Sequence, residues 1–172
     1  MCIYRSITPG LLAVLLLTAC RDSLGPIPDA PELLGVPFLT AEIDGQVWQP
    51  GTAPGHLSLF FGTHRIAITA DRPLESPSTV ERLELELETP IPPQPGSYVL
   101  NNGPAAFATL ETYTSGQITA AFTTTAQYTG TLVIAEVSSP DSLITGAFSF
   151  EAVSFDGRVS RKVRGTFRLH FP

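Results

Sequence analysis

The chain has 172 residues, 43% of them hydrophobic and 15% charged, and its net charge is −6 at pH 7. This acidic balance argues against nucleic acid as a partner, because phosphate contacts need a basic surface.

The N-terminus has the three parts of a secretory signal peptide. Arg5 supplies a positive charge, the apolar run Gly10–Leu17 follows, and small residues precede Cys20. The run is too short to span a bilayer, which takes about 20 apolar residues. The alternatives are an ordinary signal peptide followed by a chance cysteine, or an N-terminal membrane helix. The proline-rich residues after Cys20 disfavour a continued helix. We therefore predict a signal peptide over residues 1–19.

The residues around the cleavage point add a second signal. They resemble the lipobox read by lipoprotein signal peptidase, in the order Leu17, Thr18, Ala19, Cys20. The resemblance implies that the peptidase recognises the first three and that Cys20 becomes an acylated N-terminal residue. Several acyl chains hold a protein stably to a membrane. By analogy with other lipoproteins, Arg21 directly after the cysteine favours the outer membrane.

The predicted mature chain consists of a tether and one domain. It keeps nine basic and sixteen acidic residues, a net charge of −7, because the signal peptide removes only Arg5. Lipidation would consume its one cysteine, which excludes disulfides, thiol catalysis and thiolate zinc sites. Residues 20–36 are the lipidated N-terminus and a proline-rich tether. Residues 37–172 form the domain.

The domain is dominated by alternating apolar and polar residues, with glycine and proline between the runs. This pattern predicts an all-β fold, a single antiparallel β-sandwich, with an antiparallel barrel as the alternative. The expected strands are Phe38–Ile43, Gln46–Trp48, Leu57–Phe61, Arg65–Ala70, Val80–Glu88, Ser97–Leu100, Ala105–Tyr113, Ile118–Thr124, Gln127–Val137, Leu143–Phe155 and Arg158–Phe171.

The last three strands allow a register to be predicted. A two-residue turn at Asp156-Gly157 would pair Phe155 with Arg158. Behind it, the expected pairs are Ile144 with Leu169, Gly146 with Phe167, Phe148 with Gly165, Phe150 with Val163, Ser149 with Arg164 and Glu151 with Lys162. On the preceding strand they are Gly130 with Phe150, Leu132 with Phe148 and Ile134 with Gly146. Each ring then faces a glycine or an aliphatic residue, in a three-strand meander.

Several motifs resemble an uncharacterised family of all-β bacterial lipoproteins. The opening Phe38-Leu-Thr-Ala-Glu-Ile-Asp-Gly-Gln-Val-Trp48 is similar to the family pattern F-x-A-x-I-D-G-x-x-W, with the alanine one position late. The match continues, in the family's order, at Pro95–Tyr98, Gly130–Ile134, Gly146–Ala152 and Gly165–Phe167. The resemblance implies the fold and the address. It implies no catalytic residue and no activity.

The last strand carries most of the basic side chains of the mature chain. An anionic glycan or a lipid headgroup could bind there, or the strand could simply pair with acidic neighbours. The candidate binding face consists of Arg158, Lys162, Arg164 and Arg168. Arg161 has the parity of the core face, so we expect either an exposed strand end or a bulge there.

Other chemical signals are weak. Glu84, Glu86 and Glu88 alternate with leucines, which is typical of a half-buried strand with a solvated face. His56 and His64 could hold zinc only if a carboxylate met them in space. The three histidines, His56, His64 and His170, show no ligand spacing, so we predict no metal and no cofactor. Four aromatic residues could stack on a sugar or serve as core and rim residues: Trp48, Tyr98, Tyr113 and Tyr128.

Three functions remain open from the sequence. The preferred one is a non-catalytic binding or structural module at the cell envelope, with a glycan or an envelope protein as partner. The second is an envelope hydrolase built on a sandwich, which would need convergent carboxylates. The third is a barrel-type carrier of an apolar ligand, which would need a continuous apolar cavity.

The anchor is directly testable. Wild-type protein should incorporate labelled palmitate and partition into detergent, because its acyl chains are buried there. Cys20→Ser removes the acceptor sulfur and should abolish both. Labelling that persists in this variant would contradict the lipoprotein assignment.

Overall fold

The computed structural model describes residues 37–51, 57–61, 64–76, 78–103 and 105–170, with the side chains of 57–61 excepted. The signal peptide, Cys20 and the tether lie outside the described residues. The described part of the chain is all-β and contains no helix. A membrane-spanning helix is accordingly not found in it.

Eleven strands follow one another along the chain, each where the sequence predicted one, with ends displaced by three residues at most. They are β1 (Phe38–Ile43), β2 (Gln46–Trp48), β3 (Leu57–Phe61), β4 (Arg65–Pro73), β5 (Thr79–Glu88), β6 (Gly96–Leu100), β7 (Ala106–Thr114), β8 (Gln117–Thr123), β9 (Gly130–Ser138), β10 (Leu143–Ser154) and β11 (Ser160–His170). β9 begins three residues later than predicted. The Thr125 hydroxyl accepts hydrogen bonds from the N–H groups of Gln127 and Tyr128 there and makes a turn.

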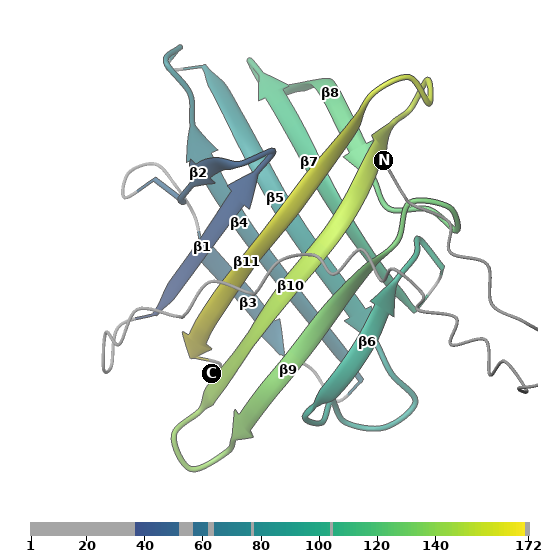
Figure 1. Cartoon of the computed structure of the whole chain (residues 1–172). Helices are drawn as coiled ribbons and strands as arrows, with labels where there is room; N and C mark the ends of the chain where they lie inside the picture. The colour runs from purple at the N-terminus through teal and green to yellow at the C-terminus, as the bar shows by residue number, and fades with distance from the viewer. Residues whose placement is uncertain (1–36, 52–56, 62–63, 77, 104, 171–172) are drawn as a thin grey trace, which may run out of the picture.

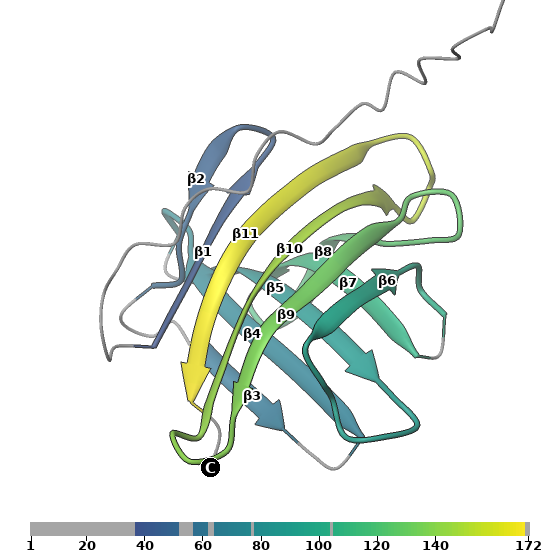
Figure 2. The same ribbon diagram turned by 60° about the horizontal axis from the view of Figure 1, so that its bottom comes forward.

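All the strands belong to one strongly curled antiparallel sheet. Its main path runs β2-β1-β11-β10-β8-β7-β5-β4-β3, and β9 and β6 branch from β10. β10 pairs with β9 along Leu143–Phe150 and with β8 only at Val153 and Ser154. Figures 1 and 2 show the result as a front layer (β2, β1, β11, β10, β9, β6) whose strands cross over a back layer (β8, β7, β5, β4, β3). The two layers resemble a sandwich, but they are halves of one sheet.

The predicted meander is present in the predicted register. β10 and β11 pair Phe148 with Gly165 and Phe150 with Val163, and β9 pairs Leu132 with Phe148. The remaining expected pairs behind the turn are also found. Because alternation places every second residue on one face, this register buries the aromatic rings between the layers.

The predicted two-residue turn at Asp156-Gly157 is wrong. The strands end at Ser154 and Ser160, and their last pair is Val153 with Ser160. The Asp156 carboxylate accepts hydrogen bonds from the Ser154 hydroxyl (2.7 Å) and the Arg158 N–H (3.2 Å), which stabilises a longer loop. This loop has the same centre as the predicted turn, so the register behind it is unchanged.

Glycines allow the closest contacts inside the front layer. A Cβ at Gly165 would lie 2.5 Å from Phe148 Cζ and would also contact the Thr40 carbonyl oxygen. The reciprocal pair places the Phe167 ring over Gly146, where a Cβ would again lie 2.5 Å from Cζ. Each ring therefore occupies the space left by a missing side chain on the neighbouring strand.

A single apolar core fills the space between the layers. The back layer supplies leucines of β5 and isoleucines of β4, and the front layer supplies the rings and aliphatic chains of β9, β10 and β11. Its largest fully buried members are Trp48, Phe148, Phe167, Ile66, Ile68, Leu83, Leu85, Leu100, Leu132, Ile134, Ile144 and Val163. The close interdigitation of these side chains gives the described domain a filled interior.

The glycine contacts predict a stability loss. Gly165→Ala should lower the free energy of unfolding by about 1–3 kcal/mol, the usual cost of overpacking, because the new methyl group contacts both a ring and a backbone oxygen. Urea unfolding measures the loss. Gly96→Ala is the matched control, since its nearest contact would be an ordinary 3.7 Å to the Tyr98 ring. Equal stability of both variants would contradict the assigned packing.

Candidate functional site

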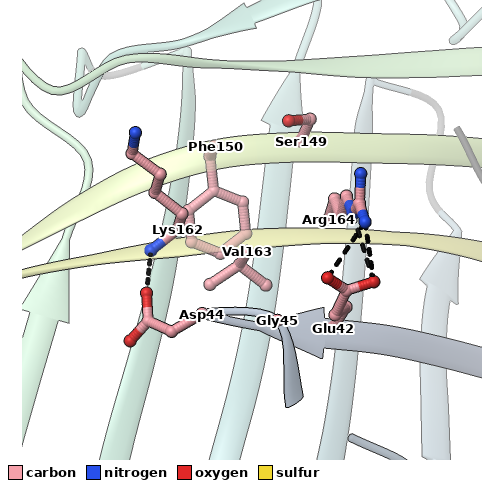
Figure 3. A pocket seen from close by; sticks show the side chains of 8 residues that line it. All are labelled: Glu42, Asp44, Gly45, Ser149, Phe150, Lys162, Val163 and Arg164. Atoms are coloured by element: carbon pink, nitrogen blue, oxygen red, sulfur yellow. Dashed lines mark hydrogen bonds and ion pairs between the residues drawn. The ribbon is translucent and has the colours of Figure 1, made fainter. Parts of the chain in front are cut away.

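The outer face of the front layer carries a hollow at the end of β1. Alternation turns Glu42 of β1, Ser149 of β10 and Lys162 and Arg164 of β11 away from the core. Together with the β1–β2 turn they surround a volume of about 380 Å³ (Figure 3). Its lining residues are Glu42, Asp44, Gly45, Ser149, Phe150, Lys162, Val163 and Arg164.

Arg164 and Glu42 form one wall as an ion pair. The two residues lie opposite each other in the β1–β11 pairing. Arg164 Nη2 lies 2.9 and 2.8 Å from the two carboxylate oxygens, and Nε lies 3.3 Å from one of them. This geometry fixes the guanidinium and largely neutralises its charge.

Asp44 forms the opposite wall from the tight β1–β2 turn. It has a positive φ of 50° and is followed by Gly45 at 82°, the conformation of a two-residue hairpin. Its carboxylate accepts hydrogen bonds from Arg161 Nη1 (2.7 Å) and from the Lys162 backbone N–H (2.9 Å). Partial desolvation opposes ionisation, but these hydrogen bonds and charges outweigh it and hold the pKa of Asp44 below its ordinary value of 3.8.

Lys162 brings to the hollow an ammonium group whose charge helps to lower the pKa of Asp44. Its side chain is exposed, and in Figure 3 it extends from β11 on the other side of Phe150 from the Ser149 hydroxyl. Among the described residues, neither the ammonium group nor this hydroxyl has a hydrogen-bond or ion-pair partner. Within the described residues, the hollow therefore offers an ammonium group and a hydroxyl without close partners, beside two carboxylates that arginines already pair.

The four basic residues of the candidate binding face do not all lie together in the structure. Lys162 and Arg164 line the hollow, whereas Arg158 lies in the β10–β11 loop, 3.6 Å from Asp156. Arg168 lies further along β11, opposite Phe38 and Thr145.

Sequence reasoning missed two walls of the hollow. Glu42 and Asp44 come from the first strand and its turn, which pair with the last strand across more than a hundred residues. An Asp-Gly dipeptide such as Asp44-Gly45 is typical of a hairpin turn, but nothing local indicates that β1 lies beside β11.

Arg161 lies at an exposed strand end, one of the two arrangements that its parity allowed. It pairs in register with Ala152, and its guanidinium carbon lies 5.4 Å from the centroid of the Phe122 ring. The side chain is 44% exposed and makes the ion pair to Asp44. Arg161 therefore covers the edge of the core where the two layers separate.

A second, smaller cavity of about 210 Å³ lies between the layers at this end. Trp48 Nε1 donates to Glu81 Oε2 at 2.7 Å, and Arg72 Nη2 donates to the same oxygen at 2.6 Å. Asp44 and Arg161 also line this cavity. Two carboxylates thus converge here, but arginines hold each of them as a hydrogen-bond acceptor.

The four aromatic residues do not form a common stacking platform. Trp48 is fully buried. The Tyr98 hydroxyl donates to the Gln94 carbonyl oxygen at 2.6 Å. The Tyr113 ring lies under the guanidinium of Arg82, whose carbon is 5.1 Å from the ring centroid. Tyr128 is half-buried in the turn before β9.

Two of the three histidines lie in the described residues. His56 falls outside the described residues, His64 is exposed, and His170 Nδ1 lies 3.2 Å from the Asp141 carbonyl oxygen. Within the described ranges, no group of three His, Cys, Asp or Glu residues is placed to hold a metal ion.

The alternating glutamates of β5 (Glu84, Glu86 and Glu88), here called the acidic stripe, lie on the outer face of the back layer. The leucines between them are buried. Arg65 Nη2 pairs with Glu86 at 2.5 Å. Burial raises the pKa of Glu84, with a further contribution from the charges of Glu86 and Glu111. β5 lies between β4 and β7, so the stripe is not on a sheet edge.

Comparison with known proteins gives no match to a protein-family model, to a curated protein or to a solved structure.

The Asp44 contacts predict a pH-dependent contribution to stability. Because the folded-state pKa is lowered, the contribution is present above pH 3.8 and is lost as the pH falls through the lowered value. Asp44→Asn, which tolerates the positive φ, should therefore be less stable than wild type near neutral pH by under about 1 kcal/mol. The two proteins should converge in acid.

Urea unfolding at several pH values, followed by the fluorescence of the buried Trp48, measures this difference. Glu75→Gln is the control, since Glu75 is exposed and has no hydrogen-bond or ion-pair partner among the described residues. A difference that stays constant with pH would contradict the role assigned to the Asp44 carboxylate.

Proposed function

We propose that this protein is a lipid-anchored envelope lipoprotein whose all-β domain binds a carboxylate-bearing glycan without catalysing a reaction. The lipobox-like sequence ending at Cys20 supports the anchor, and Arg21 supports the outer membrane. The acidic net charge disfavours nucleic acid. The ligand site is the hollow between β1, β10 and β11.

The unpaired ammonium group of Lys162 is the observation that carries the proposal. Arginines pair with Glu42 and Asp44. Glu151, which lies opposite Lys162 on β10, accepts a hydrogen bond from the Ser160 hydroxyl. A sugar carboxylate can therefore bind Lys162, while Ser149 and the rims of both carboxylates can bind sugar hydroxyl groups.

Two observations favour binding over the alternatives. The side chains between the layers interlock in one core, which argues against a continuous cavity for an apolar ligand. The carboxylates of the second cavity accept hydrogen bonds from Trp48, Arg72 and Arg161. General acid catalysis requires a protonated group in position, whereas the pKa of Asp44 is held below its ordinary value.

The test uses the acylated protein in detergent with oligogalacturonate as the charged probe and a neutral maltooligosaccharide as its comparison. Lys162→Gln should weaken oligogalacturonate binding about 10–100-fold, the equivalent of one charge-assisted hydrogen bond of about 1.5–3 kcal/mol. Isothermal titration calorimetry measures the affinity.

Arg158→Gln is the matched control, because Arg158 is a basic residue of the same hairpin that does not line the hollow. Its affinity should equal that of wild type. Equal binding of the charged and neutral probes, or equal losses in the two variants, would contradict the proposed site.

A further inference from the structure

The loop between β10 and β11 presents a phenylalanine that packs against nothing. Phe155 is 100% exposed, and Val159 at the other side of the loop is 48% exposed. A phenylalanine side chain that packs in a protein buries about 150–250 Å². In Figure 1 this loop stands at an outer corner of the molecule, where the yellow-green β10 meets the yellow β11.

The exposure is maintained by an ordered loop. Ser154 N–H donates to the Val159 carbonyl oxygen at 2.8 Å, and Gly157 N–H donates to the Ser154 carbonyl oxygen at 2.8 Å. The Ser154 hydroxyl also accepts from Val159 N–H at 3.1 Å. These bonds fix both ends of the loop, so the position of Phe155 outside the core is built into the hairpin.

The groups around Phe155 suit a membrane surface. Arg158 is 83% exposed in side chain, and its alkyl stem can lie along apolar material while its charge stays in water. Hydrogen bonds from the Ser154 hydroxyl and the Arg158 N–H lower the pKa of Asp156. Its side chain is 57% exposed and lies 3.6 Å from Arg158 Nε. The tip therefore combines an apolar end with a cation set behind it.

The length of the chain before the domain permits this tip to reach the membrane. The chain enters β1 at Phe38, which pairs with Arg168 at the end of β11 remote from the loop. β11 has 11 residues, so the loop lies about 36 Å away along the strand. Residues 20–36, fully extended, span up to about 55 Å. The tether is thus long enough for loop and anchor to meet one bilayer.

We infer that the β10–β11 loop inserts Phe155 into the interface of the lipid bilayer to which Cys20 anchors the chain. The inference rests on the proposed membrane anchor. It adds a second contact with the same membrane, and this contact fixes the orientation of the domain. With the tip inserted, the β1–β2 turn and the glycan hollow face the headgroup region.

The test places a tryptophan at the tip. The acylated Phe155→Trp variant is reconstituted into vesicles of phosphatidylethanolamine and phosphatidylglycerol with brominated acyl chains, which quench tryptophan on contact. The added fluorescence should shift to the blue and lose most of its intensity. Native Trp48 is fully buried and supplies a constant background.

Ile91→Trp is the matched control. Ile91 is 60% exposed in the β5–β6 loop, which Figure 1 shows at the opposite end of the molecule. This tryptophan should remain unquenched. Equal quenching at both positions, or none at either, in protein that floats with the vesicles would overturn the insertion while leaving the anchor intact.

Failure of the anchor itself gives a separate result. Protein that neither incorporates palmitate nor floats with vesicles would overturn the proposed function. The same variants, added without acyl chains to the same vesicles, then test the tip alone. Selective quenching of the Phe155→Trp variant would support insertion, and its absence would overturn it.

Discussion

The packing of aromatic rings against glycines is the interaction on which the rest of the structure depends. Phe148 of β10 covers Gly165 of β11, and Phe167 of β11 covers Gly146 of β10. Each of the two adjacent strands therefore supplies one ring and one glycine. The arrangement allows the front layer to approach the back layer closely while its strands bend. A side chain at either glycine would push the rings into the leucine and isoleucine core of the opposite layer.

The same pairs place the candidate site. Gly165 lies in contact with the Thr40 carbonyl oxygen, which fixes β1 against β11. One residue earlier on β11, the backbone turns Arg164 outward to face Glu42. The ion pair, the Asp44 contacts and the free ammonium of Lys162 all follow from this register. The inner face of β11 thus determines the chemistry of its outer face.

The sequence predicted those parts of the fold that depend on local periodicity. The alternation of apolar and polar residues along β9, β10 and β11 was sufficient to pair Phe148 with Gly165. The wrong turn type did not change the register, because the observed loop has the same centre as the predicted turn. β1 pairs with β11, and β10 pairs with β8 at one end and with β9 along the rest of its length. These pairings depend on contacts between distant segments, which the alternation of residues does not encode. For that reason Lys162 and Arg164 were predicted as candidates, whereas Glu42 was not.

The pairing of the first strand with the last also constrains when the domain can fold. β1 lies between β2 and β11 in the sheet. Thr40 of β1 and Thr166 of β11 contact each other although 126 residues separate them in the sequence. The front layer therefore cannot be completed until almost the whole chain has been synthesised, and closing so long a loop is slow. For a chain exported in the way proposed, this delay keeps the polypeptide unfolded while it passes through a narrow translocation channel. The front layer can then form only after the C-terminus has crossed the membrane.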